Sequence, residues 1–210
     1  MIIFDQIALL LLILVPLFGA FLMALMSKDR PKDIWYFAIF IASITLVLSI
    51  VVFCRYDYHT GGSQLANSFN WLDKPLKIEL SLGIDGISAP LVLLNGIVLM
   101  GAVLISQTIN HRPRDFFVLL FSLGSGVFGV FVARDLFFLF FFYELAVLPM
   151  YLLIGVWGSS TDFITFIRTK EYGAMKLMVF LVAGSVLIWL GILALYVESG
   201  RVGEATFSLE

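Results

Sequence analysis

The residues best suited to chemistry in this chain are a glutamate and a proline inside an apolar stretch. Residues 135–158 read DLFFLFFFYELAVLPMYLLIGVWG, with Glu144 near the middle and Pro149 five residues later. This stretch is long enough to cross a bilayer as one helix, and inserting a charge at that depth costs roughly 3 kcal/mol. Pro149 is expected to kink this helix. Because it lacks an amide hydrogen, the carbonyl of Leu145, beside the carboxylate, loses its intrahelical partner. The pattern predicts a waypoint for a proton or cation; the alternative is a glutamate held by a neighbouring helix for packing.

A lysine is the second candidate for chemistry. Lys176 lies just inside the last apolar run, in the segment EYGAMKLMVFLVAGS. It can extend to the membrane interface or lie buried as a cation facing Glu144. At about 1.5 Å per helical residue, Glu144 lies some 12 Å from the outer face, whereas Lys176 lies near the inner face. A direct ion pair is therefore not expected, and a link between them would need water or further polar side chains.

Composition places these residues in a membrane protein. The 210 residues are 61% hydrophobic and 13% charged, with a mean hydropathy of +1.04. Soluble domains are less apolar and about twice as charged, so the chain is expected to be an integral membrane protein. The net charge of −2 argues against a nucleic-acid partner. One cysteine, Cys54, and two histidines in predicted loops, His59 and His111, predict no disulfide, iron–sulfur cluster or other metal site.

Membrane-spanning helices must position the two candidate residues. Apolar runs of about 20 residues predict an all-α integral membrane protein with about six transmembrane helices. Residues 1–210 are expected to form a single membrane domain. The expected helices lie near 6–26, 35–54, 87–107, 116–133, 136–157 and 173–197.

The connections and one helix face carry their own signals. In the outer loop, 55–86, polar and apolar residues alternate from Lys77 to Leu82, which predicts a short strand or hairpin. Asp85 or Ser88 is expected to cap the third helix, and Asp135 the fifth. The pairs Ser122/Gly126 and Ser125/Gly129 have the spacing that lets membrane helices approach closely. The phenylalanines between 137 and 142 are expected to face lipid and the core rather than a cofactor.

The distribution of basic residues predicts the orientation. The connections after the first, third and fifth helices hold seven basic residues, and the opposite side holds five. The seven lie in short loops close to helix ends, where the positive-inside rule applies most strongly. Both termini are therefore expected on the outer, periplasmic face of a bacterial inner membrane.

Several motifs together resemble one protein family. LGIDGIS before the third helix, DLFFLFFFYELAVLPMYLLIGVWG across the fifth, and Lys176 followed by Gly184 and Ser185 are similar to the antiporter-like membrane subunits of respiratory complex I. The ending LPMYLLIGVWG favours the M type of subunit, the counterpart of mitochondrial chain 4, over the related L and N types.

The resemblance implies a proton-translocating module. Glu144 would be the key acid of one half-channel, coupled to nearby lysines, and Lys176 matches the lysine of the sixth helix. The chain itself would hold no cofactor, because FMN, iron–sulfur clusters and quinone belong to partner subunits of the assembly. Members of the family have about fourteen helices, built on inverted repeats that form their site at the repeat interface. We therefore expect an incomplete antiporter-like inverted-repeat fold: an N-terminal fragment, a split gene product that another chain completes, or a degenerate subunit.

Three functions remain open from the sequence. The first is a proton-translocating subunit of NADH:quinone oxidoreductase, which couples electron transfer to quinone with proton pumping and has no redox centre of its own. The second is a subunit of a multisubunit cation/proton antiporter. The third is a structural membrane anchor for neighbouring subunits.

Overall fold

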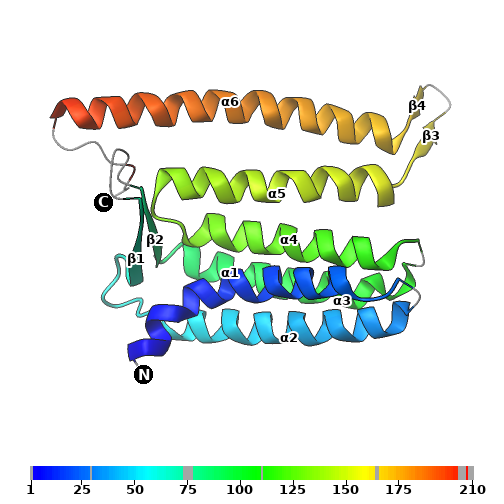
Figure 1. The fold of residues 1–210 in the computed structure, drawn as a ribbon, viewed down its shortest axis with the longest axis horizontal. Coiled ribbons are helices and arrows are strands. Elements are labelled where there is room, and N and C mark those ends of the chain that lie inside the picture. The colour runs from blue at the N-terminus through cyan, green and yellow to red at the C-terminus, as the bar shows by residue number, and fades with distance from the viewer. Residues whose placement is uncertain are drawn as a thin grey trace.

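The computed structural model describes residues 2–28, 30–72, 78–109, 111–163, 166–202 and 207. Within these residues, six helices are long and apolar enough to cross a membrane. They are α1 (Ile2–Leu25), α2 (Pro31–Arg55), α3 (Ser88–Ile105), α4 (Pro113–Val132), α5 (Leu136–Trp157) and α6 (Lys170–Val202). The helices run side by side along one common direction (Figure 1). The predicted all-α membrane architecture with six spans is therefore confirmed.

Some helix ends differ from the expected ranges. α2 begins at Pro31 and α6 spans Lys170–Val202, whereas the apolar runs began at 35 and covered 173–197. Hydropathy detects the part of a helix that lies in lipid, but the backbone hydrogen bonds continue into its polar ends. Proline at the first helical position also favours the earlier start of α2, because the missing amide hydrogen has no helical partner there.

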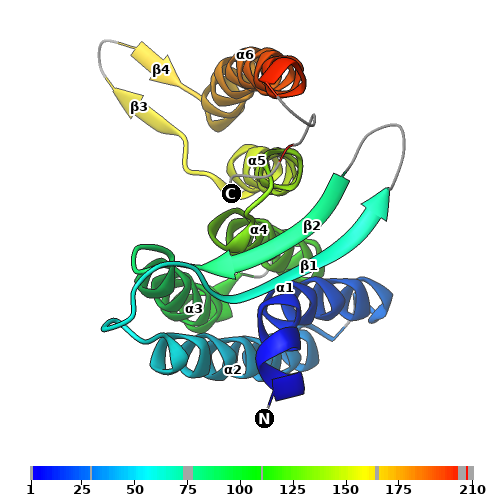
Figure 2. The ribbon, with the colours of Figure 1, turned by 90° about the vertical axis from the view of Figure 1, so that its left-hand side faces the viewer.

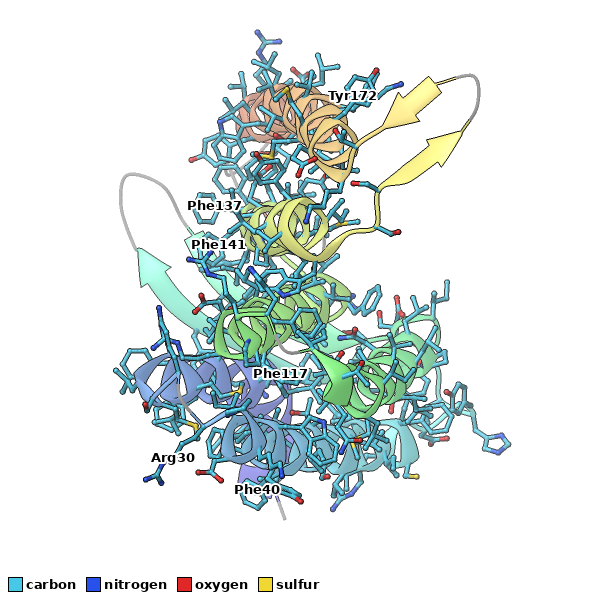
Figure 3. The ribbon with its side chains drawn as sticks, turned by 90° about the vertical axis from the view of Figure 1, so that its right-hand side faces the viewer. Arg30, Phe40, Phe117, Phe137, Phe141 and Tyr172 are labelled. Atoms are coloured by element: carbon cyan, nitrogen blue, oxygen red, sulfur yellow. The ribbon has the colours of Figure 1, made fainter. Side chains whose placement is uncertain are left out.

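The helices pack as a bundle with two further layers. Helices α1–α4 contact one another, α5 lies against α4, and α6 lies outermost against α5 (Figures 1 and 2). The three largest fully buried side chains are Phe117, Phe121 and Phe128 of α4, and smaller ones lie on α1, α2, α3 and the strand β2 (Ile78–Ile84). Figure 3 shows Phe117 inside the bundle and Tyr172 on the outermost helix. The hydrophobic core thus centres on α4.

The small residues of α4 serve two neighbouring helices. A Cβ atom on Gly126 would lie 2.9 Å from the backbone nitrogen of Ala146 on α5, and one on Gly129 would overlap the ring of Phe142. Ser125 instead faces α1, where its hydroxyl donates to the carbonyl of Ile13 at 2.8 Å. The predicted close approach of helices is confirmed. The two glycines, Gly126 and Gly129, face α5, whereas Ser125 faces α1.

Two β-hairpins lie at opposite ends of the helices. β1 (Gln64–Leu72) pairs antiparallel with β2 (Ile78–Ile84), and this hairpin lies across the end of the bundle (Figure 2). The strand predicted at 77–82 corresponds to β2; Lys77 itself lies outside the described residues. β3 (Thr161–Phe163) and β4 (Phe166–Arg168) form the second hairpin, between α5 and α6. The sequence indicated no strand there, because three-residue strands are too short to show alternation.

Aspartates precede two of the helices, as predicted. Asp135 Oδ1 accepts hydrogen bonds from the backbone amides of Phe137 and Phe138 at 2.8 and 3.1 Å. Asp85 Oδ1 accepts from the amide of Ser88, the first residue of α3, at 2.7 Å and from the Ser88 hydroxyl at 2.8 Å. These bonds satisfy amides that have no partner inside the helix.

Candidate functional site

Glu144 lies where α5 passes between the bundle and α6. The described part of α5 is one continuous helix that includes Pro149, and its phenylalanines point in several directions. Phe138 and Phe142 are buried, whereas half of the Phe141 surface is exposed. This mixture of core and open positions agrees with the predicted roles of the phenylalanine run. It also means that α5 presents one face to α4 and another to α6, and Glu144 lies on the α6 side.

The carboxylate of Glu144 has one oxygen without a hydrogen-bond partner among the described residues. Its Oε1 atom is buried, and it is the one buried side-chain nitrogen or oxygen without a partner among the described residues. Leaving a buried acceptor unsatisfied costs about 1–3 kcal/mol, and more for a charged group. Such a group needs an explanation, and an ion, a proton or a donor that reaches this oxygen would supply one.

A shallow pocket of about 210 Å³ surrounds this carboxylate. Phe140 and Glu144 of α5 line one side, and Ser185, Val186, Trp189 and Leu190 of α6 line the other. The rings of Phe140 and Trp189 stack with centroids 5.0 Å apart. The pocket is therefore mostly apolar, with a single carboxylate and a single hydroxyl among its lining residues.

Ser185 is the polar group that the structure adds to the site. It is buried, and its hydroxyl donates to the carbonyl of Val182 at 3.0 Å, so its oxygen lone pairs remain able to accept. The sequence named Ser185 only as part of a motif. The signal that could have found it is the four-residue spacing shared by Phe140/Glu144 and Ser185/Trp189, which places each pair on one helix face.

Lys176 lies away from this pocket. It is exposed, and its Nζ atom lies 6.0 Å from the ring centroid of Phe180. Nine residues of α6 separate it from Ser185, which corresponds to about 13 Å along the helix axis. Among the described residues, no ion pair joins Lys176 to Glu144. The structure thus brings Glu144 and Ser185 together and leaves Lys176 near the opposite end of α6 from the β1–β2 hairpin.

Lys170, six residues earlier, has a structural contact instead. Its Nζ donates to the carbonyl of Val156 at 2.7 Å, at the last turn of α5. A cation at this position satisfies a terminal carbonyl and favours the negative end of the helix dipole. Among the described residues, no three histidine, cysteine, aspartate or glutamate side chains lie close enough together to hold a metal ion.

Comparison with known proteins locates the chain within a family. Residues 133–209 match the family described as the transmembrane domain of NADH:quinone oxidoreductase and Mrp antiporters. The chain is 35% identical over 185 residues to NAD(P)H-quinone oxidoreductase chain 4 3 of a Picosynechococcus species, covering 88% of this chain and 32% of the relative. A chain 4 protein from a Synechococcus species is 34% identical over 200 residues, covering 95% of this chain and 35% of the relative.

Solved structures share the fold. Respiratory complex I from Thermus thermophilus contains a chain that superposes with a TM-score of 0.75 at 21% sequence identity, covering 95% of this chain and 38% of that one. The archaeal membrane-bound sulfane sulfur reductase contains another, with a TM-score of 0.74 at 20% identity, covering 93% and 38%.

The chain spans about a third of the length of the curated relatives it matches. Its fold is that of antiporter-like membrane subunits, and the domain match includes the whole of α5, where Glu144 lies. The resemblance inferred from the motifs is therefore confirmed: the chain is similar to chain 4 of NAD(P)H-quinone oxidoreductases, and residues 133–209 match the transmembrane family of NADH:quinone oxidoreductases and Mrp antiporters. Its fold is similar to that of a membrane subunit of respiratory complex I.

Proposed function

We propose that this chain is a proton-translocating membrane subunit of a complex I-type NADH:quinone oxidoreductase, with Glu144 as the intramembrane proton carrier. The observation that carries the proposal is the buried Oε1 of Glu144, which has no hydrogen-bond partner among the described residues although it lies inside an apolar span. A carboxylate whose partner is missing can gain a proton or a cation in exchange for one held elsewhere, which is the property that a relay needs.

The mechanism that this arrangement supports is electrostatic. A cation that moves toward the pocket favours the ionised carboxylate, and a cation that moves away favours the protonated one. Lys176 is the candidate cation on α6, and it would act over a distance, through water or through further polar groups. Ser185 offers an acceptor for the proton of a neutral Glu144 from across the pocket. Pro149 contributes by leaving the carbonyl of Leu145 without its intrahelical donor.

The rest of the reaction is assigned to other subunits. Electron transfer, FMN, iron–sulfur clusters and quinone reduction would belong to partner chains, and this chain would contribute the proton path alone. The membrane would be the inner membrane of a bacterium. Both described ends lie on the side of the β1–β2 hairpin (Figure 1), which the distribution of basic residues would make the periplasmic side.

The test is Glu144→Gln in the intact assembly. Glutamine keeps the size of the side chain and removes its exchangeable charge, so NADH-driven proton pumping in vesicles should be lost or strongly reduced while the assembly still forms. Glu171→Gln is the matched control, because Glu171 is an exposed carboxylate at the start of α6. A full proton-to-electron ratio in the Glu144 variant would overturn the proposal.

A cation/proton antiporter subunit is the second candidate, since the matched family includes Mrp antiporters as well. Sodium efflux that needs no NADH, and that disappears in Glu144→Gln, would favour it. If Glu144→Gln leaves every transport assay unchanged, the structural anchor becomes the better account.

A further inference from the structure

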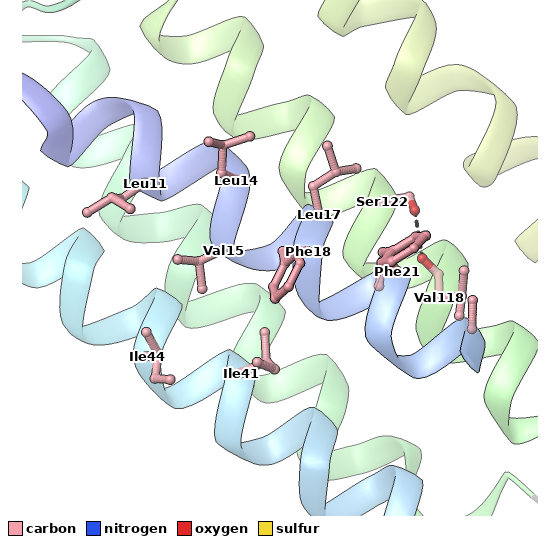
Figure 4. A pocket seen from close by; sticks show the side chains of 12 residues that line it. Leu11, Leu14, Val15, Leu17, Phe18, Phe21, Ile41, Ile44, Val118 and Ser122 are labelled. Carbon is pink, nitrogen blue, oxygen red and sulfur yellow. Dashed lines mark hydrogen bonds between the residues drawn. The ribbon is translucent and has the colours of Figure 1, made fainter. Parts of the chain in front are cut away.

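A second cavity shares no lining residue with the pocket at Glu144. It is a groove of about 880 Å³ between α1, α2 and α4, and its lining residues are shown in Figure 4. Every lining residue is apolar except Ser122, and the Ser122 hydroxyl donates to the carbonyl of Val118 at 2.8 Å. The groove therefore offers no free hydrogen-bond donor to a ligand and fits hydrocarbon.

The groove opens toward the lipid. Phe18 and Phe21 of α1 stack on each other with centroids 6.4 Å apart and form one wall, and about 60% of the surface of each is exposed. Leu14, one turn earlier, is also exposed. On α1 the lining runs from Leu11 to Ala24, about 20 Å at 1.5 Å per residue. One leaflet of a bilayer core is about 15 Å thick, so the groove is long enough to hold a lipid tail.

One end of the groove carries positive charge. Val118 lines the groove on α4, and Arg114 lies one helical turn before it. The Arg114 Nη1 atom donates to the carbonyl of Met26 at 3.3 Å, just beyond the end of α1, and its side chain is 23% exposed. Lys28 is exposed and lies four residues after Ala24, the last lining residue of α1. A guanidinium and an ammonium thus flank the place where the groove meets the interface.

The charge at this end is positive overall. Asp115 accepts from the Arg114 Nε at 3.3 Å and lies 3.8 Å from Arg112, and Arg30 lies 3.7 Å from Asp33. Around the connections that follow α1 and α3, five basic residues still outnumber three acidic ones: Lys28, Arg30, Lys32, Arg112 and Arg114 against Asp29, Asp33 and Asp115. A guanidinium also has more N–H donors than the contacts of Arg114 use, and it matches phosphate geometry.

We propose that this groove binds an anionic phospholipid, with an acyl chain along α1 from Ala24 to Leu11 and the phosphate between Arg114 and Lys28. A transmembrane helix from another subunit could fill the apolar part, but it would gain nothing from cations gathered at one end. A zwitterionic lipid would bring its own positive charge to the same cations. The charge of the headgroup therefore selects anionic over zwitterionic lipid, and the groove fixes the position of the acyl chain along α1. This site is independent of Glu144 and of the proposed proton path.

The experiment uses the assembly that contains this chain, reconstituted in vesicles of phosphatidylglycerol and phosphatidylcholine. Trace photoactivatable forms of each lipid, with the reactive group in the acyl chain, label the protein on illumination. Label on the peptides that hold Leu14 and Ser122 is then compared with the lipid composition of the vesicle. Phosphatidylglycerol should be enriched about fivefold for each cation that the headgroup contacts, since about 1 kcal/mol per basic residue corresponds to that factor.

Lys28→Gln should lower this enrichment about fivefold, and Arg114→Gln should do the same if the fold tolerates it. Lys28 is exposed, so its variant keeps the test valid if Arg114→Gln fails to fold. Arg201→Gln is the control, an exposed arginine near the end of α6. Ala24→Trp should reduce labelling by narrowing the groove, whereas Leu25→Trp, at a neighbouring position outside the lining, should not.

Two results would overturn the proposal. Labelling in proportion to the vesicle composition would mean that only bulk lipid covers the groove. No labelling by either lipid would mean that a protein segment fills it.

Discussion

The bundle of α1–α4 and the outermost helix α6, with its border to α5, differ in how tightly they pack and in whether their buried polar groups have hydrogen-bond partners. In the most apolar part of α1 and of α4, 44% of the residues are buried, whereas 11% are buried in α6. Polar groups in the bundle have partners: Ser125 donates to Ile13 of α1, and Asn95 donates to the carbonyl of Gly124 at 3.2 Å. Glu144, at the border between α5 and α6, has a buried oxygen without one.

The comparison shows where this fold can hold a reactive group. A carboxylate inside the packed bundle would be surrounded by fixed partners. A carboxylate beside a loosely covered helix can change its partner, because the pocket opposite it is shallow and open. The packed bundle therefore holds α5 in position, and the border between α5 and α6 is where the carboxylate of Glu144 can exchange its proton or cation.

The largest expected effect comes from a comparison of two glycines, one in the packed helix α4 and one in the loosely packed helix α6. Gly126→Ala places a methyl group 2.9 Å from the backbone nitrogen of Ala146, which cannot rotate away, so stability should fall by about 2 kcal/mol. Gly184→Ala on α6 meets nothing within 4 Å and should leave stability nearly unchanged. Thermal unfolding of the purified assembly measures both variants. Equal losses would show that α6 is as tightly packed as the bundle.

Acid should change the stability contributed by the two capping aspartates, Asp85 and Asp135, in opposite directions. Hydrogen bonds, first from the backbone amide of Ser88, hold the pKa of Asp85 below its ordinary value of 3.8, whereas burial raises the pKa of Asp135 above that value. The stability from Asp85 is complete above pH 3.8 and is lost as the pH falls through its lowered pKa. For Asp135 the sign reverses, and protonation between its raised pKa and 3.8 increases stability.

Asparagine at each position keeps the cap and removes the titration. Asp135→Asn should flatten the pH dependence of unfolding above pH 3.8, and Asp85→Asn should flatten it below that value. Asp85→Ala removes the cap itself and should cost about 1 kcal/mol at neutral pH. Unfolding followed by circular dichroism across this pH range checks both signs. If both asparagine variants have the same pH profile of unfolding, the opposite pKa shifts of Asp85 and Asp135 are contradicted.

The smallest expected effect compares two serines. Ser125→Ala removes a hydrogen bond between α4 and α1, and such bonds in membranes contribute about 0.6 kcal/mol on average. Ser185→Ala removes a bond within α6 and should change stability less. The same thermal measurement compares them, with Ser199→Ala at the end of α6 as a further reference. A larger loss at Ser185 would mean that α6 depends on its pocket for stability.

Several features could be predicted from short stretches of sequence. The six spans, the aspartates before α3 and α5, strand β2 and the acid inside α5 depend on local composition and on bonds between near neighbours, so one segment contains all the information. The resemblance to antiporter-like subunits followed from motifs of the same kind. The roles of Glu144, Lys176 and Pro149 stay predictions.

The tertiary structure alone decided which helix faces meet. Ser185 and Trp189 lie across from Glu144, and Phe18 and Phe21 line a groove that also includes Val118, one helical turn from Arg114. An apolar helix is hydrophobic all round, so its sequence contains no stripe that shows which side faces protein and which faces lipid. Only the packing of the other helices around it, through close contacts such as Gly126 on Ala146, selects the face.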